Sequence, residues 1–471
     1  MKKTKLITLL RTLDDKEMKD FESYLTNLYR RQAKAITVFK FIKRQWNRIL
    51  AGELTKEEAL KYQSVKALDI KAKGFSNVLS TLYLFLEEFL ILNKIKSNPS
   101  GDRDFQMIHI LKERKLNHLY QQRIKSLNKT LDKKTNENTW NRLKKFQLNH
   151  LHFFYTGTSK MKLTIDSLDA AMDNLDLFYG LTKLKYLCEI INRSNILQQS
   201  YNLERMESAV GYCRLFKKEI GRIADIYLLA YELLREGLEE TFAKLRDLYR
   251  KNIGALSKED QSIILGYLIN FTIAKVQEKP KLYYGQTFAL YKLALEQDLI
   301  VEDGIISSSS FINIATVSTQ LGEFTWFNEF VSTYQIYLPQ RIRPEVLQIC
   351  FAQEAFERGR HKMVLDYLKQ VKFATRIDFA LRVKALTLRA QWELLGNDET
   401  VRATLNAFEM YLRRNKEINE HTLKAYLNFI RFAKKLFRKN TKDWAQLVRE
   451  IERQKVIYFK YWLVEKAKAL R

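Results

Sequence analysis

Proline and glycine are scarce in this sequence. Its 471 residues include 15 glycines and four prolines, Pro99, Pro280, Pro339 and Pro344. An average protein contains about 5% proline and about 7% glycine. β-Sheets depend on tight turns, and tight turns depend on Gly, Pro and Asn-Gly pairs. We therefore expect an all-α protein, and the 46% of apolar residues are enough to form a packed core.

Cysteine is also scarce. Cys188, Cys213 and Cys350 lie far apart, and no two of them have the spacing of metal ligands. A disulfide-stabilised scaffold is therefore not indicated, and a reducing compartment fits best.

Long apolar runs are missing as well. The first run, residues 6–10, stops at Arg11 and is too short for a signal peptide. The most apolar stretch, residues 79–92, contains Glu87 and Glu88 and is too short to cross a bilayer. The sequence therefore predicts a cytoplasmic protein with no transmembrane segment.

Catalytic motifs are absent too. The sequence contains no phosphate-binding P-loop, no dinucleotide fingerprint, no His-Glu-x-x-His motif and no nucleophile elbow. His150 and His152 are two residues apart, so on a helix they point away from each other and are not expected to share a metal. We expect no enzymatic activity and no cofactor.

What the sequence does contain is positive charge, concentrated at the two ends. The formal net charge is +27, made up of +16 in residues 1–150, −2 in residues 151–350 and +13 in residues 351–471. This distribution favours two surfaces that meet an acidic partner, although a solvated lysine-rich surface would give the same pattern.

Helical signals run along the whole chain. Asp14 with Glu17 and Thr55 with Glu58 have the spacing of capping boxes. Helices are expected over about 32–50, 75–95, 103–132, 138–156 and 442–470. The last is rich in aromatic residues and is interpreted as a terminal cap. The Pro/Gly/Ser cluster at 97–102 favours a boundary, giving an N-terminal helical bundle (1–98), long helical hairpins (99–219) and a helical array (220–471).

The array shows a repeat. Gly322, Gly359 and Gly396 are spaced 37 residues apart, each between two amphipathic runs. A period of 20–50 residues is typical of stacked helix pairs. Each glycine is expected to end a helix with positive φ, and the array is expected to be an α-solenoid of antiparallel pairs.

Here the sequence resembles the tetratricopeptide-like helical repeats. Residues 392–396, Trp-Glu-Leu-Leu-Gly, match the start of that family's pattern, W-x-x-L-G, and Leu321-Gly322 matches its end. Glu399 stands where the family has Tyr, and Phe408 where it has Ala. The resemblance implies a superhelical scaffold that binds a protein or peptide on its concave face.

A second resemblance covers the N-terminal region. Residues 9–13, 21–25 and 85–90 are similar to a family of uncharacterised helical bacterial proteins, which implies no activity.

Four aspartates form an acidic stripe. Asp166, Asp169, Asp173 and Asp176 share one helical face. The stripe is consistent with a solvated surface, a divalent-cation site, or a dock for a basic partner, including one of the chain's own ends.

Two basic helical surfaces are the candidate polyanion-binding sites. The first comprises Lys40, Lys43, Arg44 and Arg48, and the second comprises Arg431, Lys434, Lys435, Arg438 and Lys439. Both have aromatic residues interleaved, so they could bind phosphates and stack on bases, or lie on an anionic membrane. They are equally consistent with amphipathic helices whose aromatic residues are core. Two functions follow: a protein-interaction scaffold, or alternatively an RNA- or DNA-binding protein.

Overall fold

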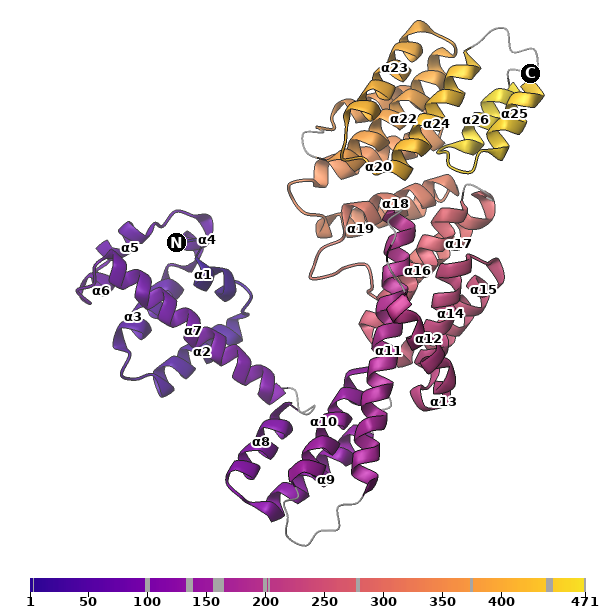
Figure 1. The fold of residues 1–471 in the computed structure, drawn as a ribbon. Coiled ribbons are helices and arrows are strands. Elements are labelled where there is room, and N and C mark those ends of the chain that lie inside the picture. The colour runs from indigo at the N-terminus through magenta and orange to yellow at the C-terminus, as the bar shows by residue number, and fades with distance from the viewer. Residues whose placement is uncertain are drawn as a thin grey trace. The chain divides into compact units, whose positions relative to one another are not determined.

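The described part of the protein is mostly helical. The computed structural model describes residues 1–2, 4–97, 102–132, 139–155, 165–197, 201, 204–276, 280–372, 376–437 and 444–469. It is 83% helical, and within these ranges the only β pairing is an isolated bridge between Glu302 and Ile305. The expected all-α class is confirmed (Figure 1).

The chain divides into two compact units. One comprises Met1–Asp132 and Leu151–Leu163, and the other comprises Lys133–His150 and Thr164–Arg471. The three domains expected from the sequence stay predictions, and the first boundary, at residue 98, lies outside the described residues.

The first unit consists mostly of short helices. In chain order they are α1 (Lys5–Leu10), α2 (Asp15–Leu28), α3 (Ala33–Arg44), α4 (Trp46–Ala51), α5 (Lys56–Lys61), α6 (Gln63–Lys66), α7 (Ala72–Ser97), α8 (Asp102–Glu113) and α9 (Asn117–Asp132). The helix α10 (Thr139–Tyr155) is divided between the units. Both expected capping boxes are confirmed. The Asp14 carboxylate accepts from the Glu17 amide at 2.7 Å, and Thr55 and Glu58 form the second box.

The long helix α7 lies at the centre of the N-terminal core. Its Phe75, Leu82 and Leu86 side chains are completely buried, and α1, α2, α3 and α5 pack against it. By length and composition alone, α7 is the one described helix that could cross a membrane, a test that the core helices of soluble proteins also pass.

Two helices that were expected to be continuous are broken. The helix over 32–50 is interrupted at Gln45 (φ −100°, ψ 17°), which separates α3 from α4. The helix over 103–132 is interrupted at Lys115, whose φ is 57°. There the Leu116 amide donates to the Leu111 carbonyl at 3.0 Å and closes α8. Neither break contains proline or glycine, the residues that most strongly disfavour a helix, so residue composition does not mark either position.

The second unit contains longer helices. They are α11 (Ile165–Leu197), α12 (Glu204–Leu215), α13 (Lys217–Ile220), α14 (Arg222–Glu236), α15 (Glu239–Asn252), α16 (Lys258–Lys275), α17 (Pro280–Glu296), α18 (Ser308–Gln320), α19 (Phe324–Tyr334), α20 (Arg343–Glu357), α21 (His361–Lys369), α22 (Ile377–Leu395), α23 (Glu399–Arg414), α24 (Glu420–Leu436), α25 (Trp444–Arg453) and α26 (Lys460–Ala469). Successive helices are packing neighbours: α18 contacts α19 and α20, and α21 contacts both α20 and α22.

The three evenly spaced glycines end helices as expected. Gly322, Gly359 and Gly396 follow α18, α20 and α22 with φ values of 75°, 72° and 60°. Gly237 also ends α14 with positive φ, at φ 64° and ψ 32°. Glycine reaches positive φ without the steric cost that a Cβ atom brings, so it allows each helix to stop and the chain to turn into the next one.

Two hydrophobic cores fill the second unit, and α22 belongs to both. Val383 and Leu386 lie in the core that extends from α11 to α22, while Leu388 and Trp392 lie in the core that extends from α22 to α26. The helix is therefore apolar on opposite sides. A charged residue on α22 consequently has few directions that lead to water.

A charged cluster joins three helices of the second unit. Asp260 of α16 is almost completely buried. Its Oδ1 accepts from Lys185 Nζ of α11 at 2.5 Å and from the Tyr227 hydroxyl of α14 at 2.6 Å, and its Oδ2 accepts from the Ser257 hydroxyl at 2.7 Å. Burial raises the pKa of Tyr227, and the negative charge of Asp260 adds to this. The hydroxyl therefore stays protonated and donates.

The C-terminal aromatic segment forms two helices instead of the single one expected. The chain turns between α25 and α26, and Phe459 takes φ 54° at this turn. The two helices pack on each other, and α26 also packs on α24. Glu393 of α22 fixes α26, because its carboxylate accepts from Trp462 Nε1 and from Lys466 Nζ, both at 2.7 Å.

Cys188 of α11, Cys213 of α12 and Cys350 of α20 are buried and free. Burial raises the pKa of each thiol, that of Cys213 to about 11.

Candidate functional site

The N-terminal basic surface is partly neutralised. Lys40 and Arg44 are exposed on α3. Lys43 forms an ion pair with Glu22 of α2 at 2.5 Å. Arg48 lies beyond the break, on α4, where it donates to the Tyr62 hydroxyl. The four side chains therefore do not form one continuous helical face.

The aromatic residues of this region belong to the core. Phe39, Ile42 and Ile49 are completely buried, and Trp46 is half-buried against the same core. Base stacking requires a free ring face, so these side chains are not available for it. The amphipathic interpretation is the one that the geometry favours here.

The C-terminal basic surface is also occupied by carboxylates. Lys434 contacts Glu409 at 2.6 Å, and Lys435 contacts Glu450 at 2.5 Å. Hydrogen bonds from Lys434 and Arg413 lower the pKa of Glu409.

The rest of the C-terminal surface offers one exposed cation. Arg431 is exposed and donates to Gln454 at 3.1 Å. Arg438 and Lys439 lie outside the described residues. The interleaved Phe429, Phe432, Leu436 and Phe437 are buried.

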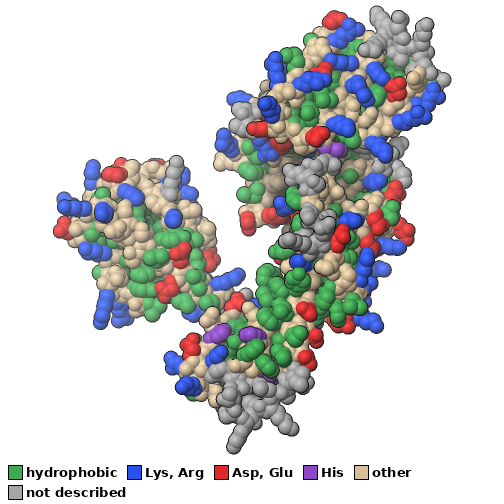
Figure 2. Space-filling model, in the orientation of Figure 1, with side chains coloured by type: hydrophobic (Ala, Val, Ile, Leu, Met, Phe, Trp, Pro, Cys, Tyr) green, Lys and Arg blue, Asp and Glu red, His purple; other side chains and the backbone are tan. Residues whose placement is uncertain are grey.

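Charges of both signs are mixed over the visible surface. In Figure 2, Asp and Glu side chains lie among the Lys and Arg side chains on both units, and the view shows no large area of a single sign.

The acidic stripe and the histidine pair do not form a metal site in the described part of the chain. Asp169, Asp173 and Asp176 are exposed on α11, and nothing is described of the Asp166 side chain. No cluster of three or more His, Cys, Asp or Glu residues suited to a metal ion is found among the described residues. Burial lowers the pKa of His152, and the nearby charge of Lys125 adds to this.

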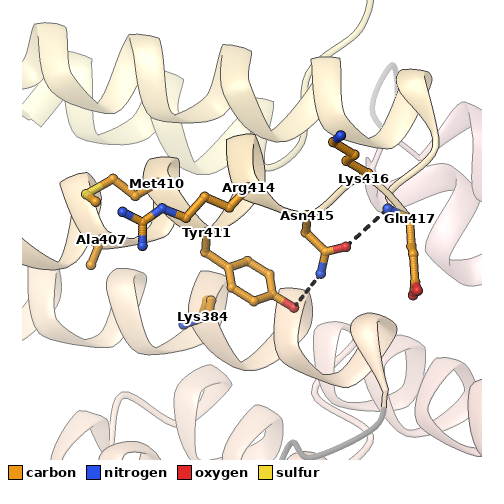
Figure 3. Close-up of a pocket in the computed structure, with 8 residues that line it drawn as sticks. All are labelled: Lys384, Ala407, Met410, Tyr411, Arg414, Asn415, Lys416 and Glu417. Carbon is orange, nitrogen blue, oxygen red and sulfur yellow. Dashed lines mark hydrogen bonds between the residues drawn. The ribbon is translucent and has the colours of Figure 1, made fainter.

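A basic depression between α22 and α23 was not predicted (Figure 3). It has a volume of about 740 Å³ and is open to solvent. Its lining residues are Lys384, Ala407, Met410, Tyr411, Arg414, Asn415, Lys416 and Glu417. The ammonium group of Lys384 lies 4.7 Å from the centre of the Tyr411 ring, and the Tyr411 hydroxyl accepts from the Asn415 amide at 3.4 Å.

This depression offers positive charge beside an aromatic surface. Its lining contains three cations, Lys384, Arg414 and Lys416, and one carboxylate, Glu417. The exposed Met410 adds a flexible apolar contact. Such a surface can hold an acidic segment that also carries apolar side chains. Sequence spacing could not identify it, because Lys384 and Tyr411 come from different helices.

Comparisons with known proteins do not indicate a function, because no family model, curated protein or solved structure matches this chain.

Proposed function

We propose that this chain is a non-catalytic helical-repeat scaffold that binds another protein or a peptide. The observation that carries the proposal is the succession of helix pairs from α14 to α24, in which three glycines with positive φ, Gly322, Gly359 and Gly396, recur at 37-residue intervals. In this proposal the pairs stack as an α-solenoid similar to tetratricopeptide-like arrays, α25 and α26 cover its end, and the concave face holds the partner.

The depression between α22 and α23 supports an acidic segment as the partner. Its three cations and single carboxylate favour negative charge, while Tyr411 and Met410 provide apolar contact. Aromatic residues and methionine are enriched at protein interfaces.

Site-specific photocrosslinking tests this proposal. A photoreactive amino acid placed at Met410, which is 49% exposed in the depression, should give a discrete adduct in cells that resists nuclease and is lost to protease. The control is the same substitution at Met363 of α21, which is 41% exposed and does not line the depression. Equal crosslinking at both positions, or adducts at Met410 that nuclease removes, would contradict the proposal.

Nucleic-acid binding is the second candidate function, and one observation favours it. Lys40 and Arg44 are four residues apart on α3, are both exposed, and have no ion pair among the described residues. Phosphate binding depends steeply on salt, because each neutralised phosphate releases counterion.

A matched pair of variants tests this candidate. Lys40→Glu with Arg44→Glu should abolish retention on RNA or heparin, whereas Lys16→Glu with Lys19→Glu, on exposed positions of α2, makes the same change in net charge and should not. Similar salt elution for both double variants and the wild type would exclude the α3 surface.

A further inference from the structure

Arg389 is an arginine in the interior of the second unit. It lies on α22, between the two hydrophobic cores, and is only 7% exposed. The central carbon of its guanidinium lies over two aromatic rings, 4.4 Å from the centre of Phe356 and 4.3 Å from the centre of Phe459. The N–H groups of a guanidinium donate in its own plane, in a fixed fork.

No carboxylate among the described residues pairs with this cation. Arg389 Nε is buried without a hydrogen-bond partner. Burial lowers the pKa of Arg389, and the negative charge of Glu357 partly opposes this. The Glu357 carboxylate itself accepts hydrogen bonds from Gln353 at 2.6 Å and from Gln320. The Glu393 carboxylate accepts hydrogen bonds from Trp462 and Lys466. A buried cation without a direct partner is costly.

The Phe459 ring that contacts Arg389 belongs to a turn with an unfavourable backbone conformation. Phe459 has φ 54°, a left-handed conformation that is unfavourable for a bulky residue. The preceding residue, Tyr458, donates from its amide to the Ala425 carbonyl of α24 at 3.4 Å.

Arg389 lines a cavity of about 320 Å³. The cavity lies among α18, α20, α21, α22, α24 and the turn before α26. Arg382, seven residues before Arg389 and so on the same side of α22, also lines it. Arg382 donates to Asn313 at 2.8 Å. The one acidic residue of the lining, Asp378, is paired with Arg376 at 2.7 Å.

The rest of the wall is mostly apolar, with hydroxyl groups at a few points. Six of the lining positions carry aliphatic side chains: Ile312, Ile349, Leu368, Leu381, Val383 and Leu386. Pockets for small molecules have volumes of roughly 300–1,000 Å³ and combine apolar walls with a few convergent polar groups. An inorganic anion would make no contact with the apolar wall, whereas a carboxylate with a hydrocarbon body would contact both the arginines and the apolar wall.

We propose that this cavity binds an organic carboxylate, with the carboxylate group against Arg389 and Arg382 and the hydrocarbon body against the aliphatic wall. This goes beyond the scaffold function, because it assigns a ligand site inside the array. The carboxylate could belong to a free aliphatic acid or to a glutamate side chain of a bound peptide, and the two sources share this chemistry.

Calorimetry and thermal-shift measurements on the full chain test the proposal with four probes: octanoate, octanol, inorganic phosphate and a capped Leu-Glu-Leu tripeptide. Octanoate or the tripeptide should bind and raise the unfolding midpoint. Binding of octanoate would identify a free aliphatic acid as the source of the carboxylate, and binding of the tripeptide would identify a glutamate side chain. Octanol and phosphate should bind at least about tenfold more weakly, because hydrogen bonds to a charged group are worth about 1.5–3 kcal/mol.

Two variants change the proposed site, and a third serves as the control. Arg389→Met should weaken binding by about tenfold or more and should leave the ligand-free midpoint unchanged or higher, because an apolar side chain of similar length replaces an unpaired buried charge. Arg382→Gln, on a half-exposed position, should weaken binding without affecting folding. Arg402→Gln removes an arginine that also lies over an aromatic ring, that of Phe437 at 5.3 Å, outside this cavity, and should bind like the wild type.

The proposal is overturned if octanoate and the tripeptide both fail to bind at millimolar concentration, if octanol binds as tightly as octanoate, or if both cavity variants bind like the wild type. A large loss of ligand-free stability in Arg389→Met, with unchanged binding in Arg382→Gln, would also overturn it, because Arg389 would then be an internally satisfied core residue.

Discussion

Gly396 and Gly237 allow the cost of a backbone conformation to be measured without a steric contribution. Both end helices with similar φ, 60° and 64°, but ψ is −131° at Gly396 and 32° at Gly237. A Cβ atom added at either position would meet no heavy atom within 4 Å. Alanine at the two positions therefore differs in backbone strain alone.

The two substitutions should have different costs. Gly237 is in the left-handed helical region, where an L-residue costs roughly 1–2 kcal/mol, so Gly237→Ala should destabilise by about 1 kcal/mol. Gly396 lies close to a region that is essentially restricted to glycine, where strain costs about 1–3 kcal/mol. Gly396→Ala should therefore destabilise by about 2–3 kcal/mol.

Asparagine separates the two conformations further. It visits the left-handed helical region readily, so Gly237→Asn should recover most of the stability lost in Gly237→Ala. Gly396→Asn should not recover, because its ψ lies outside that region. Hydrogen exchange of amides in α14 and α22 gives the local opening free energies, and urea titration gives the overall change. Equal costs for alanine at the two positions, or rescue by asparagine at Gly396, would refute this reasoning.

Three further predictions concern the second unit. Asp260→Ala leaves the half-buried Lys185 without its carboxylate and should destabilise by about 3–5 kcal/mol in thermal denaturation; a loss below about 1 kcal/mol would mean that water replaces the carboxylate. Burial lowers the pKa of His361 below its ordinary 6.5, so the unfolded chain takes up the proton first, and stability should fall as the pH drops through 6.5. His361→Gln should flatten this dependence of the urea midpoint between pH 7.5 and 5, and an unchanged slope would assign it to other groups. Trp462→Phe removes one donor to Glu393 and should lower stability by about 2 kcal/mol, whereas Tyr461→Phe, on an exposed neighbour, should not.

Local features of the fold could be predicted from the sequence. The caps at Asp14 and Thr55 and the glycine ends of α18, α20 and α22 depend on residues close together in the chain, and they appear where expected. The interruptions at Gln45 and Lys115 carry no proline or glycine, so no residue type marks where these helices end. A sequence pattern does not contain that information.

The charge patterns were harder to interpret for the same reason. Lys43 is a candidate anion ligand until Glu22, 21 residues earlier, is seen to lie 2.5 Å away. The cavity around Arg389 was hard to predict for the same reason, because the two aromatic rings beside the Arg389 guanidinium come from α20 and from the turn before α26. Two arginines seven residues apart on one helix, Arg382 and Arg389, are the trace that such a site leaves in the sequence.

The buried cysteines provide the chain with built-in reporters of local opening. The thiolate is the form that reacts with alkylating reagents, and burial holds the pKa of Cys188, Cys213 and Cys350 above the ordinary value. Each thiol therefore reacts only when the helix that carries it opens. Because the three lie on α11, α12 and α20, the labelling rate of each, followed by mass spectrometry, compares opening at the beginning and in the middle of the second unit in the unmodified protein.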